Sequence, residues 1–99
     1  MGLHISVDDR LIAQFCRKHS VRRFAFFGSV LRDDFGPESD VDVLVEFVPD
    51  REPGLIALAG MEEELSQILG RKADIRTPED LSRYFRDKVV ANAEVQYAA

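Results

Sequence analysis

Residues 41–47 read VDVLVEF, and this run of β-branched and apolar side chains predicts a buried strand. A second apolar run, FAFF at residues 24–27, predicts a shorter buried strand that ends at Gly28. Strands of this kind are stable only when other elements pack over them, so the rest of the chain has to supply that cover. The two runs therefore restrict the chain to folds built around a small sheet.

Two segments with helical periodicity are candidates to pack over the predicted strands. Residues 6–19 predict a helix with Ser6 as its N-cap, because apolar side chains recur along one stripe after it. Residues 54–70 predict a second helix that Gly70 closes. The apolar stripe of that second helix consists of Leu58, Met61, Leu65, Ile68 and Leu69.

The C-terminal third continues the alternation of strands and helices. Residues 71–76 predict a brief third strand, and Thr77 is the expected N-cap of a last helix. The apolar stripe of that helix consists of Leu81, Phe85 and Val89. We therefore expect one α/β (α+β) domain over residues 1–99, in which helices flank a small mixed β-sheet. Strand order and direction are left open by the sequence.

Charge and cysteine content narrow the functional classes. Eighteen acidic residues against thirteen basic ones give a formal net charge of -5, which opposes a long basic groove for nucleic acid. The single cysteine, Cys16, cannot form an internal disulfide, so we expect it to be a core residue of a cytoplasmic protein. Neither an apolar run of about 18 residues nor a signal-peptide pattern appears, so neither membrane insertion nor export is expected.

Asp40 and Asp42 stand at the start of the strand predicted for residues 41–47. Side chains two positions apart on a strand project from the same face, so the two carboxylates are expected to lie together and to repel. A hard divalent ion such as Mg²⁺ or Mn²⁺ would neutralise the pair. The alternative is a solvated turn in which Asp40 satisfies backbone amides, and an isolated Asp-x-Asp pair favours that alternative.

Gly28 and Ser29 end the first predicted strand and precede a short helical segment. A serine hydroxyl together with free N–H groups at a helix start can bind an anion, and a glycine allows a phosphate to approach the backbone. The alternative is an ordinary serine N-cap. Arg32, one turn later, is expected to contact phosphate, the acid pair or solvent. Phosphate and metal sites side by side would suit phosphoryl transfer.

Asp74 is the candidate for a third carboxylate, because it interrupts a short apolar strand. If that strand lies beside residues 41–47, three carboxylates could hold two metal ions; otherwise Asp74 is a polar residue at a frayed strand end. Arg76 shares the face of Asp74, and pairing with an acid is favoured over a phosphate contact. His4 and His19 show no metal-ligand spacing and are expected at the surface.

Gly28-Ser29, ten intervening residues, and Asp40-Val41-Asp42 resemble the G-S-x10-D-x-D signature of the polymerase-beta-like nucleotidyltransferase superfamily. With LGRKADIRTPEDL further along, the chain is similar to the minimal nucleotidyltransferases that pair with HEPN-domain RNase toxins in prokaryotes. The resemblance implies the nucleotidyltransferase core fold and ATP as substrate, with Ser29 at its triphosphate. It also implies Asp40 and Asp42 as metal ligands, with Asp74 as the third carboxylate.

The activity that the resemblance implies is transfer of AMP from ATP, with two Mg²⁺ ions, to a tyrosine hydroxyl of a HEPN toxin. The chain would then be an antitoxin that forms a hetero-oligomer with its partner. An alternative is a non-catalytic antitoxin that occludes its partner, for which Val95 and Tyr97 near the chain end would provide apolar contacts. Transfer to a small molecule such as an aminoglycoside is less favoured, because one small domain offers little room for an acceptor pocket.

Overall fold

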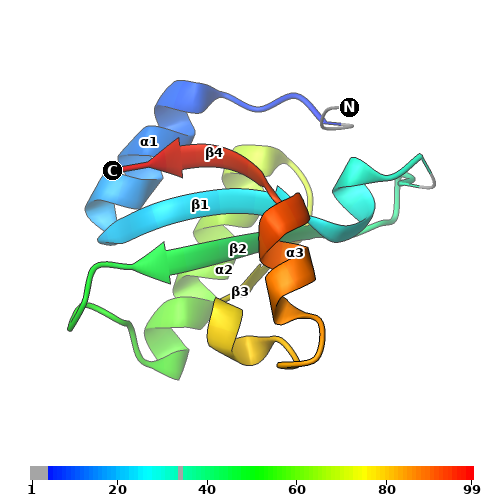
Figure 1. Cartoon of the computed structure of the whole chain (residues 1–99). Helices are drawn as coiled ribbons and strands as arrows, with labels where there is room; N and C mark the ends of the chain where they lie inside the picture. Colours follow the sequence, from blue (N-terminus) through cyan, green and yellow to red (C-terminus); the bar gives the residue numbers. More distant parts are fainter. Residues whose placement is uncertain (1–4, 34) are drawn as a thin grey trace.

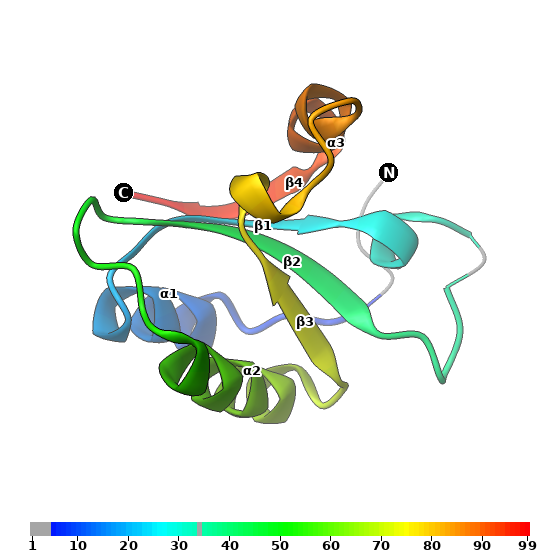
Figure 2. The same cartoon turned by 90° about the horizontal axis from the view of Figure 1, so that it is seen from below.

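The computed structural model describes residues 5–33 and 35–99, which form a four-stranded sheet with helices on both faces (Figures 1 and 2). The strands are β1 (Val21–Phe27), β2 (Val41–Phe47), β3 (Ala73–Arg76) and β4 (Glu94–Ala98). The α-helices are α1 (Asp9–Lys18), α2 (Leu55–Leu69) and α3 (Arg86–Asn92), and two short 3-10 helices are η1 (Gly28–Leu31) and η2 (Pro78–Asp80). The expected α/β class is confirmed.

The sheet is mixed, as expected, and its strand order is β3-β2-β1-β4. β1 runs antiparallel to both β2 and β4, whereas β2 and β3 are parallel. A parallel pair needs a crossover, and α2 provides it by connecting the end of β2 to the start of β3. The first residues of β2 and β3 therefore lie at the same edge of the sheet.

The hydrophobic core lies on the sheet face that α1 and α2 cover (Figure 2). Val41, Val43 and Val45 of β2 belong to one buried cluster with Phe15 of α1 and Leu65 of α2. Because side chains alternate along a strand, the residues between those valines face away from this core. That second face carries α3 and η2 (Figure 2).

The N-terminal helix begins later than its sequence pattern predicts. Asp8, not Ser6, is the N-cap, and its Oδ1 accepts hydrogen bonds from the N–H groups of Arg10 (3.0 Å) and Leu11 (3.2 Å). A carboxylate at this position also complements the positive end of the helix dipole. Both residue types are good caps, so local chemistry alone did not separate them.

The C-terminal helix predicted from Thr77 is wrong beyond its first turn. Thr77 does cap a helical turn, since its N–H donates to Asp80 Oδ2 at 3.0 Å, but the chain becomes extended at Leu81. A separate helix, α3, follows, and β4 then pairs with β1. Tyr97, expected to be available for docking, instead packs against the core, while Val95 remains 44% exposed.

Two further predictions concern single side chains. Cys16 is fully buried, and burial raises the pKa of its thiol to about 12, so it is an unreactive core residue as expected. His19 is not a free surface residue, because its Nε2 lies 2.9 Å from Glu64 Oε1 on α2. His4 lies outside the described residues.

Within the described ranges, no helix combines the length and apolarity needed to cross a membrane.

The packing of α2 yields a stability test. Leu65 has no exposed surface, whereas Ile56 on the same helix is 91% exposed. Replacing Leu65 by alanine removes buried methyl groups and leaves a cavity, so Leu65→Ala should lower the free energy of unfolding by about 2–5 kcal/mol. Ile56→Ala should change it by less than about 0.5 kcal/mol in the same urea titration. Equal losses in the two variants would contradict this placement of α2.

Candidate active site

Three carboxylates lie where the two parallel strands begin. Asp42 and Asp74 are the second residues of β2 and β3, and the parallel register pairs them directly. Asp40 ends the loop that enters β2. The sequence left open whether the strand of Asp74 lies beside that of Asp42, and in the structure the two strands are neighbours. Topology thus brings together residues that are far apart in the sequence.

The electrostatic state of Asp42 reflects this crowding. Burial raises the pKa of its carboxyl group most strongly, and the negative charges of Asp74 and Asp40 raise it further. The positive charges of Arg76 and Arg32 act in the opposite direction but do not cancel the effect. An ionised Asp42 is therefore unfavourable in this environment, and a nearby cation would relieve it.

Gly28 makes room for Asp42. Its φ is +78°, a conformation that side chains disfavour, and a β-carbon at this position would lie 2.5 Å from Asp42 Oδ2. The antiparallel register of β1 and β2, which pairs Phe27 with Asp42, creates this close approach. The sequence pointed to a phosphate near Gly28, and in the structure the Asp42 carboxylate lies against it.

Ser29 and Arg32 flank the acids. Ser29 Oγ donates a hydrogen bond to the carbonyl of Asp40 at 3.4 Å, which connects the start of η1 to the loop before β2. The helical segment predicted after Ser29 is the four-residue 3-10 helix η1, and Arg32 follows it. Ser29 lies inside η1 and is not its N-cap, because that position is Phe27.

A cavity of about 360 Å³ lies beside the glycine-serine turn. Its lining includes Gly28 and Arg32 together with Lys88 and Asn92 of α3. A volume of this size is typical of small-ligand pockets. The sequence did not indicate Lys88 or Asn92, because only the tertiary fold brings α3 to this face.

Arg76 is paired with Asp74, since its Nη2 lies 3.1 Å from Asp74 Oδ2, and this interaction raises the pKa of Arg76. Within residues 5–33 and 35–99, no three His, Cys, Asp or Glu side chains converge tightly enough to hold one ion between them. The carboxylates are thus close enough to repel but not closed around a shared point. Their all-oxygen donor set nevertheless fits a hard divalent cation.

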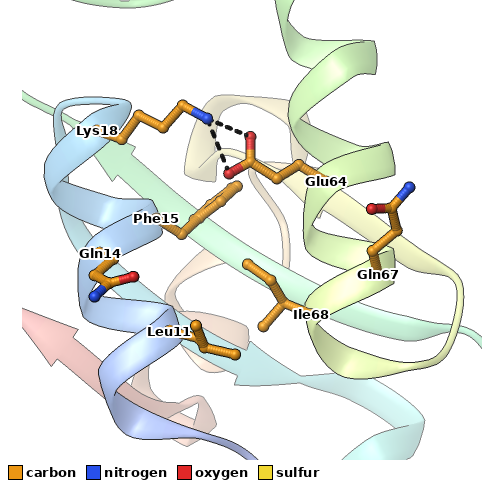
Figure 3. A pocket seen from close by; sticks show the side chains of 7 residues that line it. All are labelled: Leu11, Gln14, Phe15, Lys18, Glu64, Gln67 and Ile68. Carbon is orange, nitrogen blue, oxygen red and sulfur yellow. Dashed lines mark hydrogen bonds and ion pairs between the residues drawn. The ribbon is translucent and has the colours of Figure 1, made fainter.

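A larger cavity elsewhere lacks this chemistry. It has a volume of about 410 Å³, lies between α1 and α2, and is therefore on the opposite face of the sheet (Figure 3). Its carboxylate, Glu64, accepts hydrogen bonds from His19 and Lys18, and these contacts lower its pKa. Because this acid is already paired, the cavity offers no group comparable to the crowded Asp42.

Asp42→Asn should raise the melting temperature of the chain by a few degrees when divalent ions are absent. The pKa of Asp42 is raised above its ordinary 3.8 in the folded chain, so folding favours the neutral form of this carboxyl group. The contribution of Asp42 to stability is therefore lost as the pH rises through the pKa of the folded state. The gain should therefore be present at pH 7 and vanish in acid. Calorimetry at several pH values measures it, with the exposed Glu38→Gln as control. A lower melting temperature of Asp42→Asn than of wild type at pH 7 would contradict a crowded, destabilised Asp42 carboxylate.

Gly28→Ala should lower the free energy of unfolding by about 1–3 kcal/mol or more, because the alanine is strained at positive φ and meets Asp42 Oδ2. In an Asp42→Ala background the contact with the carboxylate is absent, so the cost should fall to the backbone part. A double-mutant cycle measured by denaturant unfolding gives this coupling. Additive effects would show that the two positions are not in contact.

Comparison with known proteins places this geometry in a family. The model of the nucleotidyltransferase domain family matches residues 8–96. Protein MJ0435 of Methanocaldococcus jannaschii, named as a candidate protein adenylyltransferase, is 31% identical over 91 residues, which are 92% of this chain and 96% of the relative. The match thus spans both proteins almost completely.

Solved structures agree with this match. A candidate minimal nucleotidyltransferase is 30% identical and superposes with a TM-score of 0.70 over 86% of this chain and 85% of its own. Two toxin-antitoxin structures share the fold at 18% identity. One contains AMP-PNP (TM-score 0.74; 94% of this chain, 75% of that chain). The other joins tri-AMPylated Shewanella oneidensis HEPN toxin to MNT antitoxin (TM-score 0.65; 92% and 70%). With the acid and glycine-serine geometry in place, the family match shows that this chain belongs to the nucleotidyltransferase domain family.

Proposed function

We propose that this chain transfers AMP from ATP to a tyrosine hydroxyl of a HEPN-domain toxin and thereby acts as an antitoxin. The observation that carries the proposal is the direct pairing of Asp42 with Asp74 beside the Gly28-Ser29 turn, in a chain of the nucleotidyltransferase family. Phosphoryl-type transfer depends on positioned carboxylates and neutralised phosphates more than on covalent chemistry by the protein. The three carboxylates and the glycine-serine turn support a role in both tasks.

Asp40, Asp42 and Asp74 would hold the divalent cations, Mg²⁺ or in its place Mn²⁺. Bound there, two such ions would lower the pKa of the attacking hydroxyl and neutralise the leaving pyrophosphate. The raised pKa of Asp42 supports this role, because a carboxylate destabilised by its neighbours gains most from a cation.

The chain's other groups would place the nucleotide. Ser29 and the backbone of η1 lie next to Asp40, where they would receive the triphosphate. Arg32 and Lys88 add positive charge at the adjacent cavity of about 360 Å³. The acceptor oxygen then bonds to the α-phosphorus, the bond to the bridging oxygen breaks and pyrophosphate leaves, while Asp74 takes the hydroxyl proton.

The acceptor is proposed from the relatives. The protein MJ0435 carries the name of an adenylyltransferase that acts on proteins, and a structural neighbour at 18% identity contains an AMPylated HEPN toxin bound by its antitoxin. The proposed assembly is thus a hetero-oligomer with a HEPN toxin. A single domain over residues 1–99, expected from the length, and a cytoplasmic location, expected from the single cysteine, belong to the same proposal.

The test is to incubate the purified chain with α-labelled ATP, Mg²⁺ and a purified HEPN-domain toxin that binds the chain. The wild-type chain should label a toxin tyrosine, and the Asp40→Asn/Asp42→Asn double variant should give only background label. Glu38→Gln, which removes an exposed charge from the neighbouring loop, should label like wild type. Toxin left unlabelled but inhibited by both wild type and double variant would instead establish an occluding antitoxin.

A further inference from the structure

Arg71 makes an unusual set of contacts for a residue in a connecting segment. It lies between α2 and β3, and its Nη2 donates hydrogen bonds to the carbonyls of Gly36 and of Ser39, the latter at 3.0 Å. Its guanidinium also lies 4.3 Å from the centroid of the Phe35 ring. The charged end of Arg71 is therefore directed into the loop between η1 and β2, a long way back in the sequence.

That loop leads straight to the acids. Gly36 and Ser39 close a turn by two mutual hydrogen bonds, from Ser39 N–H to the Gly36 carbonyl and from Gly36 N–H to Ser39 Oγ, both 3.1 Å. The Ser39 carbonyl belongs to the peptide bond that joins Ser39 to Asp40. The hydrogen bond from Arg71 therefore engages the peptide group that directly precedes the α-carbon of Asp40.

The base of Arg71 is itself held by the fold. Its N–H donates to the carbonyl of Ser66 near the end of α2 at 3.2 Å, and Ser66 Oγ accepts a hydrogen bond from the N–H of Ala73 at 2.9 Å. Lys72, which directly follows Arg71, accepts a hydrogen bond at its carbonyl from the N–H of Val41 at 2.8 Å. Residues 39–41 are thus attached to residues 71–72 on both sides of Asp40.

An arginine is suited to this position. Its Nη2 donates to both carbonyls while the planar guanidinium lies over the Phe35 ring, and a lysine has no planar group to place there. Without such a contact the loop would sample many backbone conformations, and the ordering cost would fall on ligand binding. Because the half-buried guanidinium is engaged by backbone and ring, it is placed to organise the loop and is not directed at a substrate.

We propose that Arg71 is a positioning residue that sets Asp40 in place relative to Asp42 and Asp74. The inference rests on the proposed function, since it concerns the site that would take a divalent cation with ATP. Residues that orient metal ligands commonly change metal affinity by about 10–100-fold when replaced. Arg71 would act in this way through the Ser39-Asp40 peptide bond.

The test compares Arg71→Gln and Arg71→Lys with wild type. Mn²⁺ binding is measured by titration calorimetry, and AMP transfer to the toxin is measured over a range of Mn²⁺ concentrations. Arg71→Gln should raise the half-saturating Mn²⁺ concentration about ten-fold in both assays. The transfer rate of Arg71→Gln at saturating Mn²⁺ should approach that of wild type. Arg71→Lys should have a half-saturating Mn²⁺ concentration between those of wild type and Arg71→Gln. Arg10→Gln, which changes an exposed arginine on α1, should match wild type.

A second route covers a poorly folded Arg71→Gln. Ser39→Ala removes the hydrogen bond that Ser39 Oγ accepts from the Gly36 N–H, but it leaves the backbone bond of the turn and Arg71 intact. It should also raise the half-saturating Mn²⁺ concentration. Unchanged Mn²⁺ dependence in the folded variants, with a wild-type chain that binds Mn²⁺ and transfers AMP, would overturn the inference alone. A wild-type chain that binds no Mn²⁺ and transfers no AMP would overturn the proposed function and the inference together.

Discussion

The structure depends on the parallel pairing of β2 with β3, which sets Asp42 opposite Asp74. Two like charges would separate if their strands were free to do so. They cannot, because the same register also places Val43 beside Ile75, and both side chains are buried in the core. Burial of apolar surface on one face of the sheet therefore imposes electrostatic repulsion on the other. The crossover helix α2 contributes to both, since it makes the parallel pairing possible and covers the core face.

Several neighbours accommodate this repulsion without removing it. Gly28 leaves space for the Asp42 carboxylate, Arg76 pairs with Asp74, and the charge of Arg32 partly offsets the raised pKa of Asp42. None of these contacts closes the acids around a common point within the described residues. Functional sites often hold charged groups in arrangements that lower the stability of the fold, because the unfavourable charge is compensated only when a ligand binds. The arrangement of the acids is consistent with the membership of this chain in the nucleotidyltransferase domain family.

Local patterns predicted much of this fold. The strand over residues 41–47 and the helix that ends at Gly70 match the structure because each pattern is long and regular, and Gly70 adopts the left-handed conformation expected of a helix end. The C-terminal helix was wrong because Leu81, Phe85 and Val89 have helical spacing, and spacing alone does not reveal that the chain turns back to add β4 beside β1. Asp40 and Asp42 were found from their own strand, but the adjacency of Asp74 needed the sheet order. The sequence did not predict the contacts of Arg71, because its partners Gly36 and Ser39 lie 35 and 32 positions away.

The proposed function requires that Asp40, which precedes β2, forms a divalent-cation site for ATP together with Asp42 of β2 and Asp74 of β3. The most direct measurement is a crystal structure of the chain grown with Mn²⁺ and a non-hydrolysable ATP analogue, with anomalous scattering recorded to locate the metal. We expect manganese peaks bounded by Asp40, Asp42 and Asp74, with the triphosphate at Gly28-Ser29. Nucleotide bound at another face of the sheet, with no anomalous peak near these three carboxylates, would contradict it.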